Sequence, residues 1–147
     1  MKLKYIKAHM AVAHQYANLS SAVRLQVGCI IVKDNRIISI GYNGMPTGWD
    51  NCCENVIDTK PDGTPVLKSK PEVLHAETNA IAKLASCGES GKDASLFVTH
   101  QPCLDCAKII YQSGIKEVYY AHEYRESAGI DFLNKCNIPT TQVTDFI

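Results

Sequence analysis

The chain lacks long apolar runs, an excess of charge of either sign and a large aromatic content. In its 147 residues, 15 Lys and Arg balance 15 Asp and Glu, and aromatic residues make up 7%. No apolar run approaches the roughly 20 residues that span a bilayer, and His9, His14 and Gln15 interrupt the basic N-terminus before a signal-peptide core can form. A nucleic-acid-binding surface normally gives a strongly basic chain. We therefore expect a cytoplasmic protein with neither membrane nor nucleic acid as a partner.

The chain also lacks the two features that accompany a disulfide framework, which are an even number of cysteines and a secretion signal. There are seven cysteines: Cys29, Cys52, Cys53, Cys87, Cys103, Cys106 and Cys136. An odd count in this context favours free thiols and a metal site. The length suits one domain, residues 1–147, that can bury its own core.

Hydrophobic periodicity predicts alternating helices and strands. Helical spacing or helix start and stop signals are found over residues 3–18, 75–85, 102–112 and 126–135. Short segments that are mostly apolar or β-branched predict strands over residues 27–32, 37–42, 95–100, 116–122 and 140–146. Residues 43–71 are rich in Gly, Pro, Asn and Asp and are predicted to form one long loop, and loops of this length are usually functional or disordered. This order predicts an α/β fold in which helices flank a mixed sheet.

Two cysteines at the start of a predicted helix are the first sign of chemistry. Cys103 and Cys106 are three residues apart, so their thiols share one helix face, and Pro102 suits the first helical position. The positive end of the helix dipole favours thiolates there. Two thiolates placed together call for a cation, and no second Cys-x-x-Cys exists to complete a closed four-cysteine site. A catalytic zinc needs only three protein ligands and leaves a position for water.

His75 and Glu77 begin another predicted helix and supply what the cysteines lack. His75 is the natural third zinc ligand, and Glu77 can reach over the open helix end toward a water without binding the metal. A carboxylate in that position can move protons between water and a substrate. Taken singly, His75 is more often a capping residue and Glu77 a favourable first-turn charge. A lone Cys-x-x-Cys pair could be a redox motif, but Leu104 and Asp105 between the cysteines and the lack of a thioredoxin-like opening argue against it. Taken together, the pieces indicate a hydrolytic metal site.

These motifs resemble the cytidine deaminase superfamily. "HAE" (residues 75–77) and "PCLDC" (102–106) match its zinc signature. "VGCIIV" (27–32), "GYNGMPTG" (41–48), "QPCLDCAKIIYQSGIKEVYY" (101–120) and "EYRE" (123–126) resemble deoxycytidylate (dCMP) deaminases, especially phage-encoded ones. The resemblance implies a cytidine deaminase-like three-layer α-β-α fold with a mixed five-stranded sheet. It also implies zinc-dependent hydrolysis of dCMP to dUMP and ammonia, which supplies dUMP for thymidylate synthesis, in the host cytoplasm if the chain is phage-encoded.

The same resemblance implies roles for particular residues. Glu77 is expected to be the catalytic proton carrier, with His75, Cys103 and Cys106 on the zinc. The residues expected to contact substrate are Val27, Asn43, Ala76, Tyr120, Tyr124 and Arg125, and a backbone carbonyl near His100 or Gln101 is expected to accept from the leaving amino group. Arg125 is the more specific candidate for the phosphate, because arginine can bind phosphate through two hydrogen bonds. Tyr120 could equally pack in the core, and Arg125 could be a solvated charge.

Regulation and assembly are implied as well. Members of this family are typically homo-hexamers that dCTP activates and dTTP inhibits at a separate site that requires Mg²⁺. The glycines of residues 41–48 would let backbone N–H groups approach phosphates, so Tyr42, Asn43, Gly44 and Met45 are the expected effector contacts. Asn43-Gly44 could instead be only a tight turn.

Some phage members are expected to carry a second, structural zinc, and the sequence departs from that pattern. Cys52 and Cys53 are present, but Ser20 and Ser21 stand where an early cysteine is expected, and residues 55–73 contain no histidine. We therefore expect Cys52 and Cys53 to be buried or free thiols. Two other functions remain open: a nucleoside or tRNA deaminase of the same superfamily, and a zinc-stabilised binding module without activity. A tRNA enzyme would be expected to have a basic face, and a module would need a fourth protein ligand.

Overall fold

A central sheet of five strands carries the fold in the computed structural model, which describes residues 1–146. The strand order is β2-β1-β5-β6-β7, and a separate two-stranded sheet pairs β3 with β4. The strands of the central sheet are β1 (Gly28–Lys33), β2 (Arg36–Tyr42), β5 (Ser95–His100), β6 (Glu117–His122) and β7 (Thr140–Gln142). The helices are α1 (Leu3–Ala17), α2 (Ala76–Cys87), α3 (Leu104–Gln112) and α4 (Ala128–Lys135). None of these helices is long and apolar enough to cross a membrane.

The sheet is mixed, as the sequence predicts. β1 pairs antiparallel with both β2 and β5, whereas β5, β6 and β7 run parallel. A two-residue turn at Asp34 and Asn35, both with positive φ, joins β1 to β2. Asn and Asp tolerate this left-handed conformation better than most residues, which explains the tight turn between the two strands.

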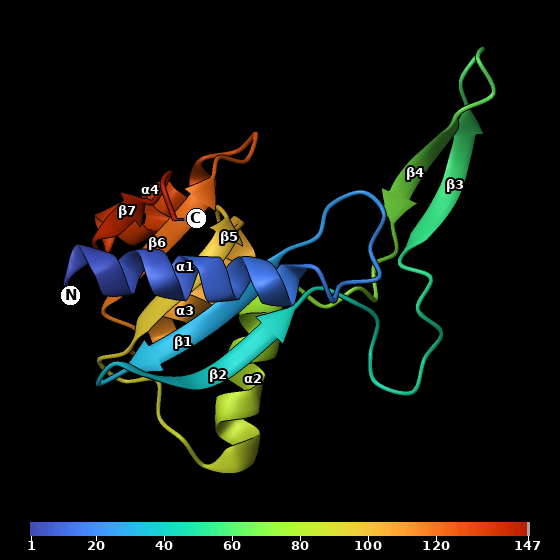
Figure 1. The fold of residues 1–147 in the computed structure, drawn as a ribbon. Helices are drawn as coiled ribbons and strands as arrows, with labels where there is room; N and C mark the ends of the chain where they lie inside the picture. Colours follow the sequence, from blue (N-terminus) through green and yellow to red (C-terminus); the bar gives the residue numbers. More distant parts are fainter. Residues whose placement is uncertain (147) are drawn as a thin grey trace.

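Helices cover both faces of the sheet, so the three-layer prediction is confirmed (Figure 1). Ile30 and Val32 of β1 pack with α1 residues such as Met10, whereas Cys29 and Ile31 pack with residues of α2 and α3. The side chains of a strand alternate between the two faces, so β1 must be apolar on both and reads as a continuous apolar run. Its first five residues are all buried.

The predicted long loop over residues 43–71 is wrong in part, because it contains a β-hairpin. β3 (Glu54–Thr59) and β4 (Pro65–Ser69) pair antiparallel and project away from the central sheet (Figure 1). Gly63 adopts a φ of 87° in the turn that joins them. Most residues of both strands are exposed, so no buried face imposes the alternating pattern from which strands are predicted.

Three predicted boundaries also shift. Pro102 is not the first residue of α3, because the helix begins at Leu104 and Cys103 is its N-cap. α4 begins at Ala128 rather than at residue 126, and β7 ends at Gln142 rather than at residue 146. Helix starts are commonly uncertain by one or two residues, and β7 pairs with β6 only over Thr140–Gln142.

Candidate metal centre and substrate cavity

Two helix starts meet at one edge of the sheet. β5 ends at His100, and the chain then passes through Cys103 into α3. α2 begins beside it with His75 as N-cap, and it packs closely against β2. A Cβ atom at Gly41 of β2 would lie 2.3 Å from the Ala76 carbonyl oxygen, so this approach requires glycine. This close contact between β2 and α2 fixes the position of the N-terminal end of α2, which carries His75.

The three predicted metal ligands converge. The His75 Nδ1 atom lies 3.6 Å from Cys103 Sγ and 3.3 Å from Cys106 Sγ, and the three ligand atoms all lie within 4.8 Å of one another. A sulfur and a nitrogen bound to one tetrahedral zinc would be about 3.5 Å apart. Cys106 is buried, whereas His75 faces the cavity described below. The donor set, two thiols and one imidazole, suits zinc and leaves its fourth position open.

Shared protons couple these three groups. A hydrogen bond from the Cys106 thiol, followed by one from His75, lowers the pKa of Cys103 to about 4. The same contacts act in the opposite direction on their donors: they raise the pKa of Cys106 and that of His75. The site therefore already holds one thiolate in place, and a divalent cation would compensate a second.

Glu77 is buried beside this cluster. Only 4% of its surface is exposed, and burial raises the pKa of its carboxyl group to about 6. Glu77 lies in the first turn of α2, two residues after His75, which is the placement predicted from the sequence. A carboxyl group with a pKa near neutrality can both accept and return a proton at physiological pH.

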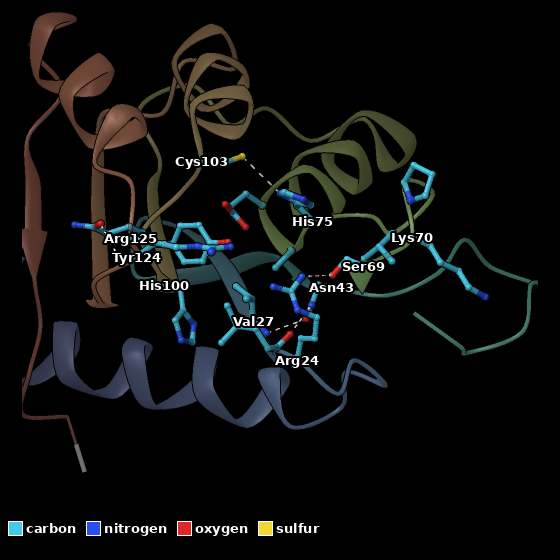
Figure 2. A pocket seen from close by; sticks show the side chains of 16 residues that line it. Arg24, Val27, Asn43, Ser69, Lys70, His75, His100, Cys103, Tyr124 and Arg125 are labelled. Carbon is cyan, nitrogen blue, oxygen red and sulfur yellow. Dashed lines mark hydrogen bonds between the residues drawn. The ribbon is translucent and has the colours of Figure 1, made fainter. Parts of the chain in front are cut away.

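A cavity of about 470 Å³ opens in front of the cluster (Figure 2). Five of the six predicted substrate contacts line it: Val27, Asn43, Ala76, Tyr124 and Arg125. Tyr120 is not among the lining residues, because it is half-buried against the core cluster of α2 and α3. The Tyr120 ring therefore packs in the core, which is the alternative that the sequence left open.

Asn43 fixes one wall of the cavity. Its side-chain oxygen accepts a hydrogen bond from the Val27 backbone N–H, and its side-chain NH₂ donates to the Leu25 carbonyl, each at 2.8 Å. Ser20 donates to the Asn43 carbonyl at 2.8 Å. Asn43 therefore does more than form a turn, because it holds the segment before β1 against the end of β2.

The other predicted effector residues lie behind this wall. Gly44 exchanges backbone hydrogen bonds with Leu74, just before α2, and the Tyr42 carbonyl accepts from Asn79 within α2. Neither Tyr42, Gly44 nor Met45 lines the cavity. Their expected role as effector contacts stays a prediction.

Sequence reasoning missed the cationic residues on the far rim. Arg24 and Lys70 line the cavity opposite Arg125, and Arg24 Nη1 donates to Ser69 Oγ at 3.4 Å. Glu54, at the base of the β3–β4 hairpin, is buried and accepts from the backbone N–H groups of Val23 and Arg24, both at 2.9 Å. Only the fold of the hairpin brings these residues together, so no local motif could have signalled them.

Cys52 and Cys53 lie near the start of this hairpin. Cys52 is exposed and Cys53 is buried. The Cys53 thiol donates to the Asn51 carbonyl at 3.7 Å, and burial raises its pKa. Both have the thiol environments expected from the sequence.

Comparison with known proteins agrees with this geometry. The family model for the cytidine and deoxycytidylate deaminase zinc-binding region matches residues 3–122. The chain therefore belongs to the cytidine and deoxycytidylate deaminase family. Within this family of zinc-dependent hydrolases, its relatives fall mainly among the deoxycytidylate deaminases.

Three curated relatives illustrate this. Human deoxycytidylate deaminase is 40% identical over 134 residues, covering 85% of this chain and 69% of its own. The deoxycytidylate deaminase of Enterobacteria phage T4 is 34% identical over 147 residues, covering 78% of this chain and 76% of its own. ComE operon protein 2 of Bacillus subtilis is 37% identical over 125 residues, covering 84% of this chain and 62% of its own, so the chain spans less than two thirds of that relative.

A solved structure matches over nearly the whole chain. It is a dCMP deaminase from cyanophage S-TIM5 in complex with dCMP and dUMP, which is 41% identical with a TM-score of 0.86. The match covers 97% of this chain and 99% of the phage enzyme.

Proposed function

We propose that the protein hydrolyses dCMP to dUMP and ammonia with a zinc ion held by His75, Cys103 and Cys106. The observation that carries this proposal is the buried Glu77 beside a two-cysteine, one-histidine donor set, at the inner end of a cavity with a cationic rim. The cyanophage relative, solved with dCMP and dUMP, supports the choice of substrate.

Glu77 is the proton carrier of the reaction. A bound zinc ion supplies a water that is acidic enough to be deprotonated near neutral pH. Glu77 accepts one proton from this water and delivers it to ring nitrogen 3 as the oxygen bonds to carbon 4. It then moves the second proton from that oxygen to the amino group, the bond between carbon 4 and nitrogen breaks, and ammonia leaves. Both protons of the water are thereby accounted for, one on the ring and one in ammonia.

The backbone around the site orients the base. Ala76 is fully buried and stands in the chain between His75 and Glu77, and its N–H lies in the first turn of α2, where intrahelical partners are lacking. The Gln101 backbone N–H donates a hydrogen bond to the His122 carbonyl at 3.0 Å, so it is not a free donor for the base. The carbonyls of the segment between β5 and α3 are the acceptors we assign to the leaving amino group.

The rim distinguishes a nucleotide from a nucleoside. Arg24, Lys70 and Arg125 put positive charge on the rim of the cavity, and we assign the 5′-phosphate of the substrate to this rim. Tyr124, next to Arg125, is anchored by its backbone N–H, which donates to Gln101 Oε1 at 3.0 Å. Charge-assisted hydrogen bonds to phosphate are about twice as strong as neutral ones, so loss of the phosphate should weaken binding markedly.

Regulation belongs to the same proposal. We assign activation by dCTP and inhibition by dTTP, each with Mg²⁺, to Tyr42, Asn43, Gly44 and Met45. Asn43 supports this assignment, because it belongs to the effector segment and also holds Val27 in the cavity wall. A conformational change in residues 42–45 can therefore move Val27 in the cavity wall through the Asn43 side chain. In the cell, the dUMP formed would feed thymidylate synthesis in the cytoplasm, and the assembly would be a homo-hexamer.

Ammonia release tests the proposal. Purified zinc-loaded protein is given dCMP or deoxycytidine, each alone and then with Mg²⁺ plus dCTP or dTTP. We expect turnover of dCMP but not of deoxycytidine, increased by dCTP and decreased by dTTP. If neither triphosphate changes the turnover of dCMP, the proposed chemistry stands and the proposed regulatory site is wrong. A preference for deoxycytidine would instead show that the enzyme acts on nucleosides.

A further inference from the structure

Three histidines gather on the opposite side of β5 from the metal centre. His14 comes from α1, His100 from the end of β5 and His122 from the end of β6. His100 and His122 are paired neighbours on the parallel strands, and their ring centroids lie 4.9 Å apart. α1 crosses this face of the sheet and brings His14 onto His122, with 3.1 Å between the two Nε2 atoms. Neither the deamination chemistry nor the cationic rim uses His14 or His122.

The protonation state of His14 follows from its other contact. His14 Nδ1 lies 2.9 Å from the Met10 carbonyl, which can only accept, so Nδ1 carries the hydrogen. In the neutral ring the lone pair is then on Nε2 and points at His122. A metal-binding histidine usually donates its other ring N–H to a carbonyl or carboxylate in this way, because this contact fixes both ring and tautomer.

The spacing of the two nitrogens fits a shared metal ion. Nitrogens that each lie about 2.0–2.1 Å from one ion, at an angle of about 90–110°, are about 2.8–3.4 Å apart. The observed 3.1 Å falls inside this range. His100 is the third imidazole of the group: its Nδ1 lies 3.0 Å from Thr99 Oγ1, a hydroxyl that can donate or accept, and its Nε2 has no part in that contact.

We propose that His14 and His122 form a second metal site for a borderline transition ion such as Zn²⁺ or Ni²⁺, with His100 as the third ligand after a side-chain rotation. The site joins α1 to the ends of β5 and β6. Because His100 also lines the substrate cavity, the ion would lie directly behind the cavity wall. It is separate from the site of His75, Cys103 and Cys106 and from the thiols of Cys52 and Cys53.

The charge state of the cluster suits this role. Burial, followed by the neighbouring His122 and His14, lowers the pKa of His100 to about 4, and burial also lowers the pKa of His14. Both shifts, at His14 and His100, favour the neutral imidazole, which is the form that binds metals. Phe146 stacks on the His14 ring with 4.2 Å between centroids, and this contact shields one side of the imidazole from water.

Metal binding to the zinc-loaded protein tests the site directly. Equilibrium dialysis with Ni²⁺ at pH 7.5, with zinc retention checked by elemental analysis, should give one Ni²⁺ per chain beyond the zinc. His14→Gln and His122→Gln should each weaken this binding by about tenfold or more, and His100→Gln should weaken it less. The matched control is His9→Gln, which changes a histidine of the same helix whose ring contacts Asn35 instead, and it should bind as the unaltered protein does.

A measurement on the unaltered protein guards against variants that fail to fold. A second equivalent of Zn²⁺ should shift the NMR signals of the His14 and His122 ring protons and leave those of His9 in place. Absence of any metal beyond the first equivalent, or unchanged Ni²⁺ binding in the His14→Gln, His122→Gln double variant, would overturn the proposal. In either case the 3.1 Å contact would be only a hydrogen bond between two neutral rings. Unchanged binding in His100→Gln alone would overturn the assignment of the third ligand.

Discussion

At the scale of single residues, Glu77 is the proton carrier that we propose, because its carboxyl group is buried beside His75, Cys103 and Cys106 without belonging to that group of possible metal ligands. We predict that Glu77→Gln keeps zinc but lowers the turnover of dCMP by roughly 10²–10⁴-fold, since an amide cannot accept and return a proton. Zinc content by elemental analysis and ammonia release from dCMP measure the two effects separately.

The matched control for Glu77→Gln is Glu89→Gln, an exposed carboxylate just past the end of α2. This control should leave both zinc content and turnover unchanged. Loss of zinc in Glu77→Gln would mean that the carboxylate helps to hold the ion, and the assigned role of proton carrier would then be wrong.

His100 makes a second residue-scale prediction, which concerns stability and pH. Its folded-state pKa of about 4 lies below the ordinary value of 6.5, so the unfolded chain binds a proton more readily than the folded one. Its contribution is therefore present above about pH 6.5 and is lost progressively as the pH falls toward 4. Because the ring is only half-buried, solvent screening limits the loss to roughly 1 kcal/mol.

Urea unfolding at several pH values measures this effect. The free energy of unfolding of His100→Gln should fall less between pH 6.5 and pH 4 than that of the unaltered protein. Parallel curves for the two proteins would show that the folded-state pKa of His100 is not lowered.

The residues that could be predicted from sequence are those that chemistry places in a fixed local pattern. Two short motifs predict His75, Glu77, Cys103 and Cys106 because they put the required groups at helix starts. The structure brings the His75, Cys103 and Cys106 ligand atoms together, with Glu77 beside them. Arg24 and Lys70 were not identified, because a lone cation in a polar segment gives no local signal. Tyr120 lies in a motif that also packs the core, and sequence could not separate the two roles.

At the scale of elements, the β3–β4 hairpin shapes the cavity from outside the main sheet. Buried Glu54 accepts from two backbone N–H groups of the Arg24 segment, which ties that segment to the hairpin. We predict that Glu54→Ala raises the KM for dCMP about tenfold and changes kcat little. The substitution removes the side-chain acceptor of the Val23 and Arg24 N–H groups and so loosens the segment that carries Arg24.

Steady-state kinetics with dCMP and deoxycytidine check this prediction. Glu54→Gln should recover most of the lost affinity, because its amide oxygen still accepts, and Glu89→Ala should have no effect. An equal rise in KM for deoxycytidine would indicate general damage to the cavity rather than a loss at the phosphate end.

The elements themselves were predictable to the extent that packing imposes a pattern on them. The strands of the central sheet were found because they are buried on one or both faces, as β1 and β5 show. The hairpin was missed because both of its strands are mostly exposed, and the start of α3 was misplaced because Cys103 rather than Pro102 marks its boundary. Whether a strand could be predicted therefore depended on its burial rather than on the β-propensity of its residues.

At the scale of the whole molecule, contacts within one chain do not account for the stability of the β3–β4 hairpin. Two strands without a covered face are marginally stable in water, yet this pair exposes 63% of Val56 and 59% of Ile57. Exposed apolar side chains grouped on a projecting element are typical of a surface that meets another protein. In the proposed homo-hexamer, we expect the hairpin to pack against a neighbouring copy.

Replacing Val56 and Ile57 together by lysine tests the role of the hairpin in assembly. We expect the double variant to shift from hexamers toward smaller species in light scattering coupled to size-exclusion chromatography, because two charges replace apolar contacts. Asn55→Lys with Thr59→Lys adds the same charge to exposed polar positions of the same strand and should leave the assembly intact. Since β4 leads into Ser69 and Lys70 on the cavity rim, dissociation should also raise the KM for dCMP. A double variant that stays hexameric would place the interface elsewhere, and one that dissociates with an unchanged KM would show that each chain forms its phosphate rim alone.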